Sequence, residues 1–286
     1  MMKIKQLITR AVGLGLNLLS FFTPRRAGYL AYLVFVSPPA PLVRPKEKAF
    51  LATAQRQDAT VAGKPVVLYH WAMEDERRPW VLLSYGWGYN AGRWRHFVPG
   101  LLVAGYRLTA YDPTGHGQAP KGRLHFADNM NILIALMETY GQPAAFIGHS
   151  FGGACGVQSL AFLDRKLHPK RMVIMASFSH AEQSVFQVFK RMLGLNERMY
   201  TAFCDTIMAQ AGLRRTKDTN IGAFSAQLGH IPVLLVHDPA DPVTPYEQVY
   251  GYYHNWPGSE LYTPTQAGHH LGTQEVTNRV LAFVQL

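Results

Sequence analysis

A serine between glycines has the clearest chemical meaning in this sequence. Ser150 lies in the segment 148–153 (GHSFGG), after the apolar residues 144–147 and before a helix-like stretch. Small residues two positions before and two after the serine relieve crowding in a tight strand-to-helix turn. Such a turn lifts the hydroxyl above the sheet at a helix N-terminus, where developing negative charge is stabilised. The pattern therefore predicts that Ser150 is a nucleophile.

A neutral serine needs a base, and the base needs an acid that orients it. The apolar residues 232–237 predict a strand, and Asp238 and Asp241 follow it in a proline-rich loop. Ligands of open α/β sheets bind outside the carboxyl ends of the strands, so an acid just past this strand is well placed. We favour Asp241 as the orienting acid. Asp238 precedes a proline and is interpreted as a turn residue, with the catalytic role as its alternative.

The base is expected from the histidine pair His269 and His270, which follows the last predicted strand. This position places a base after the serine and the acid, in the order that such a catalytic set requires. We favour His269, directly after a glycine, and keep His270 as the alternative. His149 is beside the nucleophile but should point sideways from the turn, so it is interpreted as structural. The twelve histidines show no metal-ligand spacing, and neither a metal nor a cofactor is predicted.

An oxyanion requires two backbone N–H groups that converge on one point. One is expected from Phe151, directly after the serine. The other is expected from Trp87, in the glycine-rich loop 85–90 (YGWGYN) that follows the predicted strand 80–83. Its glycines allow the backbone to approach a substrate carbonyl closely. A simple glycine-rich turn is the alternative interpretation of this loop.

Elements that could position these residues alternate along most of the chain. Strands are expected at 66–70, 80–83, 107–111, 144–147, 172–175, 231–237 and 260–263, and helices at 93–104, 127–140, 151–163, 246–253 and 274–283. A charged turn, 74–78, is expected to join the first two of these strands. This alternation predicts an α/β fold with a mostly parallel sheet that helices cover on both faces.

Two regions depart from the alternation. Residues 178–229 hold aromatic and methionine residues at helical spacing, which predicts a helical cap, or lid, with plain core-facing helices as the alternative. The stiff segment 37–41 (SPPAP) separates N-terminal helices from the main body. The expected organisation is a basic amphipathic helical extension at 1–50, a core at 51–177 and 230–286, and a cap at 178–229.

The basic character of the chain is concentrated at its N-terminus. The formal net charge is +10, and residues 1–50 contain eight Lys and Arg residues against Glu47 alone. The sequence has no helix-turn-helix, zinc-finger or RNA-binding aromatic pattern, so nucleic acid is not a predicted partner. Two cysteines, Cys155 and Cys204, do not make a disulfide framework.

The first helix is expected to be amphipathic with a basic end. Its polar positions are Lys3, Gln6, Arg10, Gly13, Asn17 and Ser20, and its apolar positions are Ile4, Leu7, Ile8, Leu14, Leu18 and Phe22. Such a helix would lie on an anionic membrane surface or pack on its own domain, and both interpretations stay open. Segment 21–26 offers no small-x-small cleavage site, and the apolar run 27–36 is about half the length that spans a bilayer. We expect a cytoplasmic location, peripheral to the inner membrane surface if the helix binds lipid.

From about Arg56 to its C-terminus the chain resembles the α/β-hydrolase superfamily of serine hydrolases, and in particular small bacterial esterase-like hydrolases with a helical lid. The matching motifs, in order, are the loop 85–88, the segment 112–117 (DPTGHG), the serine turn 148–153, Asp241 with Val243 and Pro245, and Gly268 with His269. The family usually has His-Gly at 85–86 and Pro-Gly-His-Gly at 114–117, where this sequence has Tyr-Gly and Thr-Gly-His-Gly. Neither departure removes a backbone donor, so activity is expected to survive.

The resemblance implies an eight-stranded, mostly parallel sheet and catalysis through an acyl-enzyme. Ser150 would attack an acyl carbonyl, His269 would transfer the proton, and Asp241 would orient the imidazole. Water would then hydrolyse the acyl-enzyme without a cofactor.

The expected substrate is a carboxylic ester with a hydrophobic acyl group. Trp87, Tyr89 and Phe151 would make the mouth of the site apolar, and Tyr85, Gly86 and Tyr89 would line the pocket. A thioesterase or acyltransferase of the same fold, and an inactive hydrolase-fold binding protein, are the alternatives.

Overall fold

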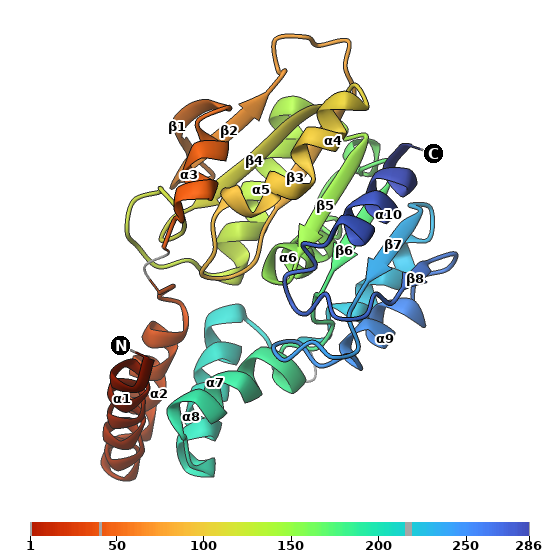
Figure 1. Cartoon of the computed structure of the whole chain (residues 1–286). Coiled ribbons are helices and arrows are strands. Elements are labelled where there is room, and N and C mark those ends of the chain that lie inside the picture. The colour runs from red at the N-terminus through yellow and green to blue at the C-terminus, as the bar shows by residue number, and fades with distance from the viewer. Residues whose placement is uncertain (1, 40–41, 215–218, 286) are drawn as a thin grey trace. The chain divides into compact units, whose positions relative to one another are not determined.

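The computed structural model describes residues 2–39, 42–214 and 219–285. These residues form two compact units (Figure 1). The core unit comprises Pro38–Ser179 and Ile221–Leu286, and the helical unit comprises Met1–Ser37 and His180–Asn220. Both units combine segments that are far apart in the sequence.

An eight-stranded sheet forms the centre of the core unit. Its strands are β1 (Gln55–Val61), β2 (Lys64–Trp71), β3 (Trp80–Ser84), β4 (Arg107–Pro113), β5 (Ala145–His149), β6 (Met172–Met175), β7 (Val233–Val236) and β8 (Glu260–Tyr262). Their order is β1-β2-β4-β3-β5-β6-β7-β8. The pairs β1–β2 and β2–β4 are antiparallel and the other neighbours are parallel. The predicted mostly parallel sheet is therefore confirmed.

Helices flank this sheet in the core unit. They are α3 (Pro45–Leu51), η1 (Ala91–His96), α4 (Val98–Val103), α5 (Phe126–Tyr140), α6 (Phe151–Ser159), η2 (Arg165–Leu167), η5 (Gly222–Leu228), α9 (Gln248–Tyr253) and α10 (Gln274–Gln285). Strand residues alternate between two faces. Val81 and Leu83 pack with Leu101 of α4 and Val280 of α10 in one hydrophobic cluster. On the other face, the Phe146 ring lies against Gly156 of α6.

The structure differs locally from the prediction at one strand and one helix. The strand β1 was not predicted, because its residues are polar and mostly exposed, as befits the edge of a sheet. The charged turn 74–78 joins β2 to β3 along the chain as predicted, and β4 lies between these two strands in the sheet. The predicted helix 93–104 is a 3₁₀ turn followed by α4, which begins where Pro99 fits the first turn of a new helix.

The helical unit contains α1 (Met2–Phe22), α2 (Pro24–Phe35), the short π-helix η3 (Glu182–Phe186), α7 (Gln187–Leu193) and α8 (Glu197–Ala211). One hydrophobic cluster joins the N-terminal helices to the later ones. Phe35 of α2 makes edge-on contacts with the rings of Phe186, Phe189 and Phe203. Phe186, Phe189 and Phe203 thus form a core together with α1 and α2.

The boundaries of the units differ from the predicted ones. The division falls directly before Pro38, within the predicted break, of which residues 40 and 41 lie outside the described residues. Helix α3 belongs to the core unit, because Leu51 packs in its hydrophobic cluster. The predicted role of segment 178–229 as a lid stays a prediction.

Replacement of Phe203 tests the shared core of the helical unit. Phe203 is fully buried, so Phe203→Ala should lower the free energy of unfolding by about 3–5 kcal/mol if the unit unfolds as one body. Limited proteolysis should then cleave α1 and α2 as well as α8. Phe162→Ala, at a phenylalanine of the core unit that is 68% exposed, is the matched control and should leave the digestion unchanged. Protection of residues 1–37 in the Phe203 variant would contradict a shared core.

Candidate active site

Ser150 occupies a strained turn between β5 and α6. Its backbone angles are φ 51° and ψ −120°, a conformation that non-glycine residues rarely adopt and that is typical of functional sites. A Cβ at Gly148 would lie 2.6 Å from Gly153 Cα, and one at Gly152 would lie 2.5 Å from Ser84 O. Glycine is therefore required on both sides of the serine.

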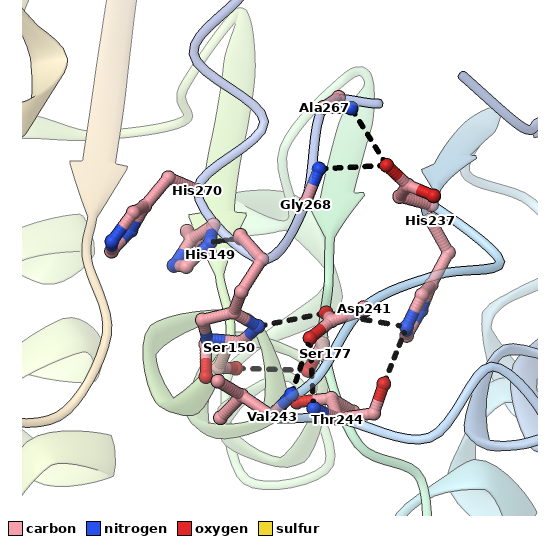
Figure 2. A network of polar contacts seen from close by, with 12 residues as sticks. His149, Ser150, Ser177, His237, Asp241, Val243, Thr244, Ala267, Gly268 and His270 are labelled. Carbon is pink, nitrogen blue, oxygen red and sulfur yellow. Dashed lines mark hydrogen bonds and ion pairs between the residues drawn. The ribbon is translucent and has the colours of Figure 1, made fainter. Parts of the chain in front are cut away.

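The end of β6 holds this turn in place. The Ser150 N–H donates to Met175 O at 2.8 Å. Ser177 Oγ donates to Ser150 O at 2.9 Å, as Figure 2 shows. The Ser150 side chain is partly exposed and its hydroxyl makes no hydrogen bond to the described residues. The hydroxyl is thus accessible while the backbone that carries it is fixed.

The structure brings two of the predicted catalytic residues into direct contact. His269 Nδ1 lies 2.8 Å from Asp241 Oδ2, and the Asp241 side chain is completely buried. Its other oxygen accepts hydrogen bonds from the N–H groups of Val243 and Thr244, as Figure 2 shows. Burial opposes ionisation, but these bonds and His269 hold the pKa of Asp241 below its ordinary value. An ionised Asp241 fixes the proton of a neutral His269 on Nδ1 and leaves Nε2 as the basic nitrogen.

Asp238 holds the loop that carries the histidine. One carboxylate oxygen accepts hydrogen bonds from the N–H groups of Ala267 and Gly268, each at 2.7 Å. The other accepts from Ala240 N at 2.8 Å, which is the turn contact expected of this residue. Despite the opposing effect of burial, these N–H groups keep the pKa of Asp238 low. The two aspartates thus have different partners: Asp238 binds backbone and Asp241 binds the imidazole.

The other two histidines near Ser150 have different partners. His270 points away from Asp241 in Figure 2, and its Nε2 lies 3.2 Å from Tyr89 Oη. Burial and the nearby Arg93 charge lower the pKa of His270 to about 4. His149 is buried and donates from Nε2 to the His269 carbonyl oxygen at 2.7 Å. Burial, with the neighbouring His269, lowers the pKa of His149 well below its usual range, so this ring is neutral.

Loop 85–90 lies directly against the serine turn. A Cβ at Gly86 would come within 3.1 Å of both Ser150 Cβ and His149 Nδ1. Phe151 is the first residue of α6, so its N–H has no acceptor within the helix. The Trp87 ring packs edge-on against the Phe151 ring, with centroids 5.2 Å apart. The two residues expected to donate to the oxyanion therefore have side chains that pack against each other.

Tyr85, Gly86 and Tyr89, the predicted pocket residues, line one cavity together with Phe151. The Tyr85 ring stacks on His149 with centroids 4.4 Å apart and an interplanar angle of 17°. Its edge contacts with Tyr89 and Trp94 complete an aromatic cluster. Tyr85 therefore supports the nucleophile turn by packing.

Two buried acids, Asp112 and Glu47, hold loop 85–90 and the residues that follow it. Neither was predicted to belong to the site. Asp112, at the end of β4, accepts hydrogen bonds from Ala91 N at 2.7 Å, Gln118 N at 2.9 Å and Tyr69 Oη at 3.0 Å. It thereby joins the loops after β3 and β4.

Glu47 of α3 is 1% exposed and forms a 3.0 Å ion pair with Arg93. Its other oxygen accepts from Asn90 Nδ2 at the end of loop 85–90. Its position as the only acid among the first fifty residues was the signal that could have revealed this role.

His237 and Ser177 were also missed. His237 Nε2 donates to Thr244 O at 3.0 Å and lies 3.6 Å from Asp241 Oδ2, so it supports the loop beneath the acid. Ser177 holds the carbonyl of Ser150, as described above. Within the described residues, no group of three or more His, Cys, Asp or Glu side chains could hold a metal ion.

Comparison with known proteins gives two family models. A model described as α/β hydrolase fold matches residues 79–203, and a model described as TAP-like protein matches residues 195–285. Epoxide hydrolase B of Mycobacterium tuberculosis is 33% identical over 102 residues, which are 34% of this chain and 27% of that protein. Monoacylglycerol lipase of Mycolicibacterium smegmatis is 30% identical over 103 residues, which are 33% of this chain and 37% of that protein. The match therefore spans well under half the length of both relatives.

Solved structures agree over a larger region. The enol-lactonase from Burkholderia xenovorans LB400 has a TM-score of 0.61 at 19% identity, over 80% of this chain and 100% of that chain. The two family models, which together span residues 79–285, show that the chain belongs to the α/β-hydrolase superfamily, and the solved structure shares its fold.

Proposed function

We propose that this α/β hydrolase cleaves a carboxylic ester through a Ser150–His269–Asp241 triad and an acyl-enzyme. The observation that carries the proposal is the 2.8 Å contact between His269 and a buried, ionised Asp241. It orients the imidazole in the same unit that holds Ser150 in a strained, accessible turn. A serine nucleophile needs such an oriented base.

The proposed reaction has two halves. Ser150 Oγ attacks the acyl carbonyl while His269 Nε2 takes its proton, and Asp241 stabilises the resulting imidazolium. The N–H groups of Phe151 and Trp87 stabilise the oxyanion, and the imidazolium returns its proton to the leaving alcohol. Water, deprotonated by His269, then attacks the acyl-enzyme and releases the acid and free Ser150.

The identity of the nucleophile favours acyl substrates over epoxides. Some relatives are named epoxide hydrolases. A serine that opened an epoxide would form an ether, which has no carbonyl for water to attack, so turnover would stop after one cycle. A serine acyl ester has that carbonyl and is hydrolysed. The aromatic rings of Trp87, Tyr89 and Phe151 support a hydrophobic acyl group.

Replacement of the proposed nucleophile and base tests this mechanism. Ser150→Ala and His269→Ala should each lower kcat for p-nitrophenyl esters by at least about a thousandfold and abolish fluorophosphonate labelling. Ser259→Ala, a partly exposed serine outside the site, and His270→Ala are the matched controls and should retain both signals. A wild-type chain that neither labels nor turns over esters or thioesters would contradict the proposal. A loss of both signals in His270→Ala but not in His269→Ala would show that His270 is the base.

Replacement of the two aspartates should separate their roles. Asp241→Asn should lower kcat by about ten-thousandfold with little change in KM, because the amide favours the wrong histidine tautomer. Asp238→Asn should lower kcat by only about tenfold, since it loosens the loop and leaves the 2.8 Å contact between residues 241 and 269 intact. Steady-state kinetics at neutral pH measure both effects. A larger loss in Asp238→Asn would contradict the assignment.

The pH dependence of stability gives an independent test of Asp238. Its pKa is lowered in the folded protein, so its contribution to stability is present above the unfolded pKa, about 3.9. That contribution is lost as the pH falls through the lower folded pKa. The difference in free energy of unfolding between wild type and Asp238→Asn should therefore be constant from pH 7 to 5 and shrink below pH 4. Denaturant titrations across this range would contradict the assignment if the difference grew on acidification.

A further inference from the structure

The first helix exposes a stripe of large apolar side chains. Leu7, Leu14, Leu18 and Phe21 are 71%, 61%, 57% and 59% exposed, and Phe22 is 84% exposed. Their spacing of mostly three, four or seven residues places them on one side of α1. A contiguous exposed apolar surface is uncommon on a protein that works as a monomer in water.

The opposite side of α1, which packs on α7 and α8, buries Leu16 in the hydrophobic cluster of the unit and is otherwise small and polar. A Cβ at Gly13 would lie 1.8 Å from Leu193 O, so only glycine permits this approach. Asn17 donates to Gly194 O at 2.9 Å and accepts from Asn196 N at 3.0 Å. Most of the large apolar side chains of this helix thus face outward, whereas an ordinary surface helix buries them. The helix packs on its own unit, as one of the two interpretations expected, but its apolar stripe stays exposed.

Helix α2, which lies beside α1 in Figure 1, also packs through a small residue and exposes large apolar ones. Gly28 is buried, and a Cβ there would lie 2.2 Å from Ala202 O of α8. Tyr29, Leu30 and Val34 are 49%, 45% and 40% exposed. Small residues at the helix contacts with large apolar residues outside are typical of helices packed in apolar surroundings.

The charges of this segment match an anionic surface. Residues 1–37 contain no Asp or Glu, and Arg10, Arg25 and Arg26 are exposed. Arg25 and Arg26 lie just after the exposed Phe21 and Phe22 in the chain. Aromatic and basic side chains together are characteristic of segments at the boundary between lipid headgroups and acyl chains. Each basic residue near an anionic leaflet adds to the attraction between this segment and the headgroups.

We propose that the exposed faces of α1 and α2 bind the surface of a membrane that contains anionic lipids. The apolar side chains of α1 enter the outer acyl region, and the arginines contact the headgroups. Within the part of the chain that the structure describes, no helix is long and apolar enough to cross a membrane. This proposal concerns the helical unit alone and is independent of the proposed hydrolase activity.

Vesicle sedimentation of the full chain tests the proposal. Wild type should pellet with vesicles of phosphatidylcholine and phosphatidylglycerol in a 7:3 ratio, less with pure phosphatidylcholine, and less as salt rises. The double variant F21S/F22S should partition at least about tenfold more weakly, because it removes apolar contacts with the acyl region. The double variant R25E/R26E should lose the preference for anionic vesicles. Acidic residues favour a helix N-terminus, so this change does not weaken α2.

Phe162→Ser is the matched control, since it removes an exposed phenylalanine of the core unit and should leave partitioning unchanged. Equal thermal melting of all variants shows that they are folded. A wild type that stays in solution with anionic vesicles overturns the proposal, as does equal binding by F21S/F22S. Sedimentation velocity supplies the remaining outcome: a dimer that F21S/F22S dissociates, without vesicle binding, would show that a second copy covers this surface and would also overturn the proposal.

Discussion

The site depends on how closely backbone segments approach one another at Ser150. The turn around this serine has room for no side chain at Gly148 or Gly152, and Gly86 brings a second loop against the Ser150 Cβ. These contacts leave little freedom for the strands that carry them. The register of β3 beside β5, and of β5 beside β6, places the ends of three strands together at this point. Loops after those ends, and the one after β7, can then reach a common site, as expected for parallel sheets.

Buried carboxylates hold the loops around the Ser150 turn, which have no regular secondary structure of their own. Asp112 binds the loops after β3 and β4, Glu47 binds the end of the glycine-rich loop, and Asp238 binds the histidine loop. Each accepts backbone N–H groups or side-chain donors that would be unpaired in the interior without it. Only Asp241 binds a group that the proposed reaction uses. Most of the acidic residues around the site therefore hold loops in position, and one acts on the proposed base.

The residues that the sequence analysis identified are those with local signals. The pattern around Ser150 follows from a steric requirement within six residues, and Asp241 and His269 each follow a strand end. The supporting residues lack such signals. Asp238 and Asp112 bind N–H groups on other loops, and which N–H groups they meet depends on the path of those loops. The polar strand β1 has no apolar alternation. The core shared by α1, α2, α7 and α8 joins two distant segments, and no sequence pattern in either segment indicates that they pack together.

The shared core of the helical unit also has a consequence for the order in which the chain can fold. Helices α1 and α2 leave the ribosome before the core sheet, but the aromatic residues that complete their core lie in residues 182–211. At ordinary rates of synthesis, α1 and α2 are without these partners for on the order of ten seconds. Most of the core sheet is synthesised during this interval. Helices α1 and α2 therefore gain their final packing long after their synthesis, and they are exposed to chaperones or other surfaces until then.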